Sequence, residues 1–205
     1  MTQSTPVYLA SRSPRRRELL RQIGVAFEVV LLREAGPRRI DVAETPRAGE
    51  GAGEYVLRVS REKALAAAGV VRARRLAAHT VLAADTAVIC DDAILGKPSG
   101  AADAARMLAM LAGRSHRVLT AVAVARGDAI DTRLSASTVW FRALATDEIR
   151  RYVATGESTD KAGAYAVQGR AASFITRIDG SYSGIMGLPL AETAELLRSH
   201  GIIVP

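Results

Sequence analysis

Residues 80–90 form an almost unbroken apolar run, TVLAADTAVIC, which contains a single carboxylate, Asp85, followed by a hydroxyl, Thr86. A run this hydrophobic predicts a strand buried at the centre of a sheet. A carboxylate inside such a strand must be paired, protonated or metal-bound, because burying a bare charge costs several kcal/mol. Asp85 is therefore the best catalytic candidate in the sequence. The alternative is an aspartate that caps a turn where the strand stops.

Strands and helices alternate along the chain. Apolar runs predict strands at residues 7–10, 27–32, 80–90, 115–126, 129–142 and 174–178, and the helical period predicts helices at 14–24, 54–75, 99–112, 146–155 and 188–200. We expect Leu65 on a buried helix face, Gly69 as a break in the same helix, and Ser99 as a helix cap. This order, with a hairpin added late, predicts an α/β fold with a mixed sheet.

The first predicted strand leads into a helix start that carries three arginines, Arg15 to Arg17. Ser13 is a favourable N-cap and Pro14 a favourable first helical residue. The helix dipole favours acids at this end, so basic residues there suggest an anionic partner. Backbone N–H groups and the guanidinium groups of Arg15 and Arg16 suit phosphate oxygens. The alternative is a solvated basic turn.

Composition narrows the class of protein. With 205 residues and 49% hydrophobic content, the chain can form one large domain or two lobes, and it has no apolar run of membrane-spanning length and no signal-peptide pattern. We therefore expect a soluble, cytoplasmic protein. A single cysteine, Cys90, excludes an internal disulfide and fits a small core residue. The net charge of +7 raises nucleic-acid binding as an alternative, but the charge is scattered and aromatic residues make up only 4%.

Only three of the 28 basic residues are lysines: Lys63, Lys97 and Lys161. An ammonium is a compact point charge on a flexible stem, whereas guanidinium is a planar fork, so these three positions are candidates for a role that arginine does not fill. The alternative is that these three lysines remain in the sequence by chance and have no special role. His116 begins a predicted strand, where a surface position and a functional role are equally compatible with the sequence.

Several polar residues stand out from their surroundings and balance cations against acids: Arg15, Arg16, Glu44, Lys63, Asp85, Lys97, Lys161 and Gln168. Carboxylates hold Mg²⁺ or Mn²⁺, while arginine and lysine neutralise phosphate charge. The Gly-x-Ser-x-Gly nucleophile motif is absent. The residues alone therefore predict metal-assisted hydrolysis or transfer on a phosphorylated small molecule.

Seven blocks occur in order along the chain: LASRSPRRRELL (9–20), REKA (61–64), ADT (84–86), GKP (96–98), HRVLT (116–120), DKAGAYAVQG (160–169) and GSYSGIMGLPL (180–190). They carry a resemblance to the Maf nucleotide pyrophosphatases. It implies one Maf-like domain over residues 1–205, with an inosine-triphosphatase-like α/β fold, a mixed twisted sheet with flanking helices, and a cleft between two lobes. It also implies cleavage of nucleoside triphosphates to monophosphate and pyrophosphate.

The same resemblance implies roles for individual residues. Asp85 corresponds to the family's catalytic aspartate, as general base or metal ligand, and Glu44 to its glutamate, with Asp41 as the competing assignment because the preceding loop looks long. The implied substrate-binding residues are Ser11, Arg15, Arg16, Lys63, Thr86, Lys97, Lys161 and Gln168, of which Arg15, Thr86 and Gln168 correspond to positions that set base preference. The Ala-Tyr…Gln form of the sixth block resembles the branch acting on dTTP and UTP.

The implied cofactor is a divalent cation, Mg²⁺ or Mn²⁺, held by Glu44 and Asp85. The implied partner is the nucleoside triphosphate, with no stable nucleic acid and no membrane, and a homodimer is an expectation from the family only. Two other readings compete with the enzyme: a basic nucleic-acid-binding protein, and a regulatory, division-associated protein without turnover. The second would lack a motif residue, and none is missing.

Overall fold

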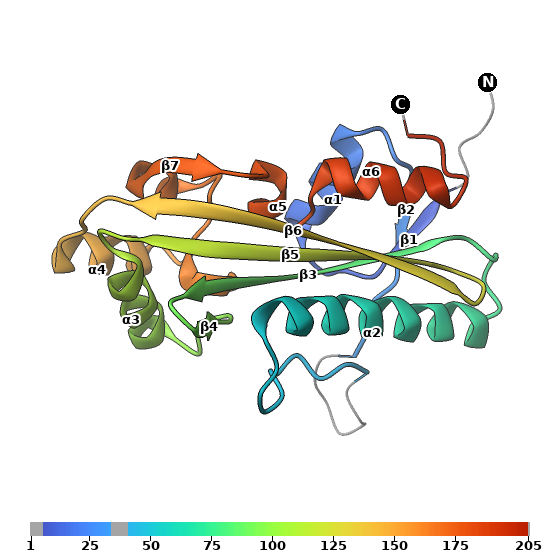
Figure 1. The fold of residues 1–205 in the computed structure, drawn as a ribbon, viewed down its shortest axis with the longest axis horizontal. Helices are drawn as coiled ribbons and strands as arrows, with labels where there is room; N and C mark the ends of the chain where they lie inside the picture. The colour runs from blue at the N-terminus through green and yellow to red at the C-terminus, as the bar shows by residue number, and fades with distance from the viewer. Residues whose placement is uncertain (1–5, 34–40, 205) are drawn as a thin grey trace. The chain divides into compact units, whose positions relative to one another are not determined.

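The computed structural model describes residues 6–33 and 41–204 (Figure 1). Its strands are β1 (Val7–Leu9), β2 (Phe27–Val29), β3 (Val81–Cys90), β4 (Ala93–Leu95), β5 (Ser115–Arg126), β6 (Ala129–Phe141) and β7 (Ile175–Asp179). Its α-helices are α1 (Pro14–Gln22), α2 (Ala52–Ala73), α3 (Ala101–Leu111), α4 (Thr146–Ala154), α5 (Tyr182–Met186) and α6 (Leu190–Ser199), and two 3₁₀ turns cover Ala162–Ala164 and Arg170–Phe174.

The strands form one seven-stranded sheet in the order β2-β1-β3-β5-β6-β7, and β4 pairs with β3 off this path. β1 pairs in parallel with both β2 and β3, whereas β4 runs antiparallel to β3 and β7 antiparallel to β6. The predicted α/β class, mixed sheet and flanking helices are therefore confirmed. β3 is buried along its whole length apart from the half-buried Thr86, as its apolar sequence predicts.

The chain divides into two compact units. The first unit comprises Met1–Asp85, Thr120–Leu134 and Gly187–Pro205, and the second comprises Thr86–Leu119 and Ser135–Met186. In the first unit, the α2 residues Ala64, Ala67 and Val71 pack against β3 and β5. In the second, α3 packs on α4 over an aromatic cluster that includes Phe141 and Phe174. The predicted single domain over 1–205 and the predicted cleft between lobes stay predictions.

Three local expectations were wrong. Leu65 is 48% exposed, and α2 continues through Gly69 without a break. Ser99 does not cap α3 with its side chain; Gly100 is the N-cap. Leu65 is next to the buried Ala64 and therefore about 100° away from it round α2. A single glycine costs a helix only about 1 kcal/mol. At α3, the Asp103 carboxylate accepts the Ser99 N–H at 3.0 Å.

His116 lies in the core of the second unit, so the surface alternative for this residue is wrong. Its Nε2 lies 2.9 Å from the Tyr165 hydroxyl, and its ring meets those of Phe141 and Tyr165 edge to face. Burial lowers the pKa of His116 to about 4. The imidazole is therefore neutral at pH 7. The predicted core position of Cys90 is confirmed, since this residue is 1% exposed.

Gly163 joins two of the sequence blocks within the second unit. Its N–H donates to the Gly96 carbonyl at 3.1 Å, its φ is +69°, and a Cβ built on it would lie 2.9 Å from three carbons of Val88. We expect Gly163→Ala to lower the free energy of unfolding by about 2–4 kcal/mol, because a left-handed alanine and an overpacked contact both cost energy. Urea denaturation followed by circular dichroism measures the loss.

Gly127→Ala is the matched control, because Gly127 has a similar φ of +60° and a methyl group added to it would have nothing within 4 Å. This variant should lower the free energy of unfolding by about 1–2 kcal/mol, because only the strain of a left-handed alanine remains. Equal losses for the two variants would mean that the contact with Val88 contributes nothing.

Candidate active site

Asp85 lies in the middle of β3, so the turn-cap alternative is wrong. The residue is only 5% exposed. Its Oδ1 accepts a hydrogen bond from Lys63 Nζ at 2.8 Å, while its buried Oδ2 has no hydrogen-bond partner among the described residues. Burial raises the pKa of Asp85, and the positive charges of Lys63 and Arg16 oppose that rise. The carboxylate thus has one oxygen fixed by an ammonium and one left for another group.

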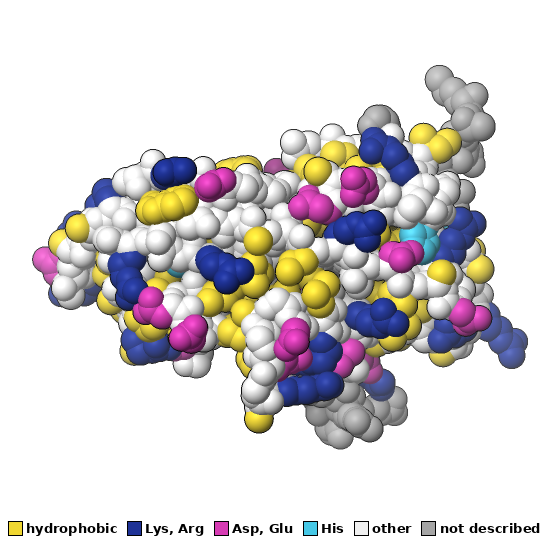
Figure 2. Space-filling model, in the orientation of Figure 1, with side chains coloured by type: hydrophobic (Ala, Val, Ile, Leu, Met, Phe, Trp, Pro, Cys, Tyr) yellow, Lys and Arg dark blue, Asp and Glu magenta, His cyan; other side chains and the backbone are white. Residues whose placement is uncertain are grey.

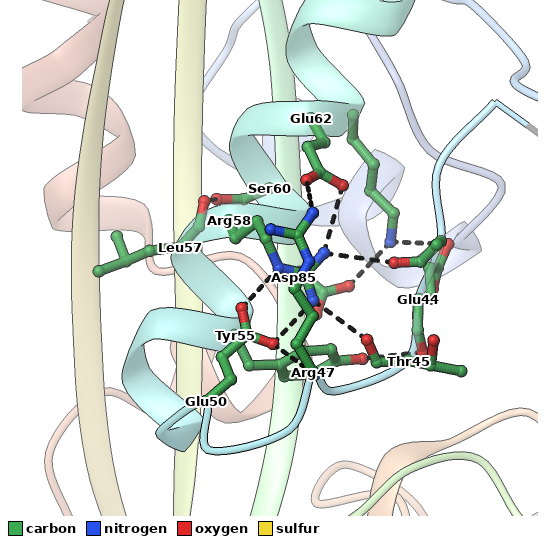
Figure 3. A network of polar contacts seen from close by, with 12 residues as sticks. Glu44, Thr45, Arg47, Glu50, Tyr55, Leu57, Arg58, Ser60, Glu62 and Asp85 are labelled. Carbon is green, nitrogen blue, oxygen red and sulfur yellow. Dashed lines mark hydrogen bonds and ion pairs between the residues drawn. The ribbon is translucent and has the colours of Figure 1, made fainter.

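Lys63 connects the two acids of the site. It projects from α2, and its Nζ lies 2.8 Å from Asp85 Oδ1 and 3.0 Å from Glu44 Oε1. Both acids are labelled in Figure 3. The three side chains come from a helix, a strand and the loop before that helix. The Lys63 side chain is only 12% exposed, so these charges interact through little water. A divalent cation held by the two acids would lie close to the positive charge of Lys63. A phosphate group would be attracted to that same lysine charge.

The structure distinguishes the two candidate loop acids. Glu44 reaches Lys63, whereas both carboxylate oxygens of Asp41 are occupied by Arg33, whose Nε donates to Oδ1 at 2.9 Å and whose backbone N–H donates to Oδ2 at 2.8 Å. The Arg33 guanidinium lowers the pKa of Asp41. Glu44 is therefore the loop acid that contacts the Lys63–Asp85 pair.

The start of α1 supplies the cations. Ser13 caps the helix as predicted, with its side chain accepting the Arg16 N–H, and Pro14 is the first helical residue. The Arg16 side chain donates to the Gly187 carbonyl at 2.6 Å and to Ser11 Oγ at 3.5 Å. Burial lowers the pKa of Arg16, while the charges of Asp85 and Glu44 raise it, as expected for a guanidinium close to both acids.

Ser11, Arg15, Arg16, Glu44, Lys63 and Asp85 all belong to the first unit. Of these, Glu44 and Asp85 each contact Lys63 directly, and Arg16, next to the half-buried Arg15, interacts electrostatically with both acids. The structure thus brings together residues that are up to 74 positions apart (from Ser11 to Asp85) in the sequence.

Thr86, Lys97, Lys161 and Gln168 belong to the second unit. Lys97 is exposed, and Lys161 donates to the Glu157 carbonyl at 2.6 Å and pairs with Asp160. Gln168 is exposed in a turn closed by a 3.0 Å hydrogen bond from Gly169 N to Ala166 O. A glutamine that merely forms a turn before Gly169 would lie in the same place, so the role of Gln168 in reading the base stays a prediction.

Sequence reasoning missed Glu157, which holds the backbone just after Gln168. Its carboxylate accepts the Arg170 N–H at 3.0 Å, the Ala171 N–H at 3.4 Å and the Tyr152 hydroxyl at 2.9 Å. A Cβ at Gly169 would collide with this carboxylate. The glycine was the available signal, because a residue without a side chain beside Gln168 lets a neighbour come close to the backbone.

Glu44 and Asp85 could bind a divalent cation, but they offer only a few oxygen ligands. No group of three or more His, Cys, Asp or Glu side chains able to hold a metal occurs in residues 6–33 and 41–204. Glu44 and Asp85 nevertheless offer carboxylate oxygens, and the unpartnered Asp85 Oδ2 is buried beside Lys63. Mg²⁺ is commonly bound by one or two carboxylates together with substrate phosphates. Two acids are thus sufficient when the substrate supplies further oxygens.

Comparison with known proteins identifies the family. The family model described as "Maf-like protein" matches residues 6–200. This chain belongs to the Maf family. The resemblance read from the seven sequence blocks is thereby confirmed.

Curated Maf relatives match along nearly the whole chain. Proteins named dTTP/UTP pyrophosphatase from Aromatoleum aromaticum and Burkholderia pseudomallei are each 57% identical to it, covering 95% and 94% of this chain and 95% and 92% of their own length. One of the same name from Nitrosospira multiformis is 54% identical, covering 96% and 95%. The solved structure of the Staphylococcus aureus Ham1 protein aligns with a TM-score of 0.48 and 17% identity over 96% of this chain and 97% of that chain, a likeness that supports no further conclusion.

Proposed function

We propose that this Maf protein is a nucleoside triphosphate pyrophosphatase that hydrolyses dTTP and UTP, and modified pyrimidine nucleotides, to the monophosphate and pyrophosphate. Relatives at 54–57% identity carry the name dTTP/UTP pyrophosphatase. The observation that carries the proposal is the buried Asp85 and the half-buried Glu44, joined by the Lys63 ammonium, with Asp85 Oδ2 left unpartnered among the described residues. Such a site combines acids for a metal ion with cations for phosphate.

In the proposed reaction, the oxygen of a water molecule bonds to phosphorus and the α–β phosphoanhydride bond breaks, so that pyrophosphate leaves and the water's proton passes to a base. Arg16 and Lys63 bind phosphate oxygens and stabilise the charge that builds on the leaving group. Asp85 Oδ2 accepts the proton or ligates the metal. A cation bound by Glu44 and Asp85, Mg²⁺ or Mn²⁺, would supply further charge neutralisation.

The remaining residues keep the roles that the family resemblance implies: Ser11, Arg15, Lys97 and Lys161 as phosphate contacts, and Arg15, Thr86 and Gln168 as residues that select the base. We propose that the two units work as one Maf-like domain and that the substrate is the principal partner. On the face drawn in Figure 2, lysine and arginine side chains are interspersed with acidic ones, which supports a small anionic ligand over a nucleic acid. No helix in the described part of the chain is long and apolar enough to cross a membrane.

The proposal is tested by measuring pyrophosphate and orthophosphate release from dTTP, UTP, CTP, ATP and GTP, with and without Mg²⁺. We expect pyrophosphate as the first product, fastest from dTTP and UTP, and only with the metal. Orthophosphate as the first product would refute the proposed bond cleavage. A basic nucleic-acid-binding protein would instead release neither and would lose DNA affinity steeply with salt.

The assignment of the loop acid makes a separate prediction. Glu44→Gln should raise the Mg²⁺ concentration needed for half-maximal rate by about tenfold or more, because a ligand charge is lost. Asp41→Asn is the matched control, since Asp41 is occupied by Arg33, and it should leave the Mg²⁺ requirement within about twofold of wild type. The reverse ranking in a Mg²⁺ titration would return the assignment to Asp41.

A further inference from the structure

The segment that carries Glu44 is fixed by side chains of α2. The Tyr55 hydroxyl donates to the Glu44 carbonyl at 3.1 Å, and Arg58 donates to the Thr45 carbonyl at 3.1 Å and the Ala43 carbonyl at 3.4 Å. Three consecutive carbonyl groups are therefore held from one helix; Figure 3 labels Glu44, Thr45, Tyr55 and Arg58. Burial and the charges of Asp85 and Glu44 raise the pKa of Tyr55, so its hydroxyl stays protonated and able to donate.

Arg58 is itself immobilised by carboxylates. Its Nε and one terminal nitrogen donate to the two oxygens of Glu50 at 2.5 and 2.8 Å, and the other terminal nitrogen donates to Glu62 at 3.2 Å. With the two carbonyl contacts, this makes five hydrogen bonds, which equals the number of N–H donors in a guanidinium. The Arg58 side chain is 13% exposed and that of Glu50 is 10% exposed, so the group is shielded from solvent.

This arrangement matters because Glu44 lies outside any helix or strand. The position of an acidic side chain on irregular backbone depends on the contacts that hold its loop. Asp85 and Lys63, in contrast, are fixed by a strand and a helix. Lys63 contacts the Glu44 carboxylate itself, whereas Tyr55 and Arg58 hold the backbone that carries it. The guanidinium also stacks over the Tyr55 ring, 5.6 Å from its centroid, which joins the two supports into one unit.

We propose that Arg58 is a positioning residue that holds Glu44 against Lys63 and Asp85 and thereby sets the affinity of the acid pair for a divalent cation. The proposal rests on the proposed function. Arg58 acts through the backbone on both sides of Glu44 and does not contact the substrate. A lysine at this position would keep the positive charge but could not supply the five-donor fork, so the role depends on arginine.

The test is Mn²⁺ binding to the full chain, measured by electron paramagnetic resonance of free Mn²⁺ in the presence of a non-hydrolysable α,β-methylene dTTP analogue. Arg58→Lys should weaken Mn²⁺ binding about tenfold, because removing the outer partners of a ligand typically costs ten- to a hundredfold in affinity. At saturating metal, kcat should recover to within about threefold of wild type. A loss of stability alone would not produce this split.

Two further variants make the result specific. Arg142→Lys is the matched control, because Arg142 forms a similar two-pronged pair with Glu148 in the second unit, and it should leave Mn²⁺ affinity unchanged. In a Glu44→Gln background, Arg58→Lys should have no further effect on Mn²⁺ affinity, since the two changes act through the same carboxylate. If Arg58→Lys does not fold, Glu50→Gln removes the main anchor of Arg58 and should weaken Mn²⁺ binding in the same direction.

Unchanged Mn²⁺ affinity in Arg58→Lys, or in Glu50→Gln where that variant is needed, overturns the proposal. An equal loss in the wild-type and Glu44→Gln backgrounds overturns it too, because Arg58 would then act elsewhere. A wild-type protein that cleaves dTTP but binds no Mn²⁺ overturns the positioning role and leaves the proposed cleavage of dTTP intact. A wild-type protein that binds Mn²⁺ but releases no pyrophosphate refutes the proposed function alone.

Discussion

Asp85→Asn is expected to lower kcat by about a hundredfold or more while the protein still folds. The amide has nearly the volume of the carboxylate, so packing in β3 is kept. It can neither accept a proton from water nor bind a cation with a full charge. Lys63 retains Glu44 as a partner at 3.0 Å, which limits the cost of losing its 2.8 Å contact with Asp85.

The measurement is steady-state pyrophosphate release at saturating dTTP and Mg²⁺, with the thermal transition recorded in parallel. Asp131→Asn is the control, because Asp131 also belongs to the first unit and pairs with His200 at 2.9 Å. It should keep nearly full activity. An Asp85→Asn variant with more than about a third of wild-type kcat would make Asp85 a structural residue.

Gln168→Glu is expected to lower kcat/KM for dTTP and UTP relative to CTP and GTP by about ten- to a hundredfold. Uracil and thymine present two carbonyl acceptors and one N–H donor along one edge, and a glutamine amide can both donate and accept. A carboxylate has no donor for the carbonyls. Because Gln168 is exposed in its turn, the substitution should not disturb folding.

The comparison needs kcat/KM for all four nucleotides in both proteins. Gln22→Glu is the control, since it makes the same chemical change at the exposed end of α1, and it should leave selectivity unchanged. An equal drop for all four substrates would mean that Gln168 supports the turn or the phosphates and does not read the base.

The parts of the site that lie on regular elements could be predicted from the sequence. The apolar run around Asp85 predicts a buried strand because a continuous hydrophobic segment can only be accommodated in an interior. The cap at Ser13 and the proline after it predict the start of α1 to the residue. Both signals depend on neighbouring residues only. In both, the predicted structure is lower in free energy than the alternatives, an uncapped helix end or an exposed apolar strand.

The sequence favoured Glu44 as the loop acid but left Asp41 as a competitor, because the choice depends on which cation reaches each acid. That outcome depends on Arg33, eight residues from Asp41 in the chain, and on Lys63, which α2 brings back to Glu44. Arg58 also escaped notice, since one arginine among so many gives no local signal. Its five acceptors come from residues 43–62, and only the folded loop gathers them.

The division into two units has a consequence for how the chain can be taken apart. The boundaries follow Asp85, Leu119, Leu134 and Met186, so each unit is assembled from separated pieces of sequence, and β3, β5 and β6 each contribute residues to both. No single cut of the polypeptide releases either unit whole. Neither could have been gained or exchanged as a module by recombination at one point. The peptide bond after Asp85 is itself a boundary between the units. The acid that Lys63 contacts in the first unit is therefore bonded directly to Thr86, the first residue of the second unit.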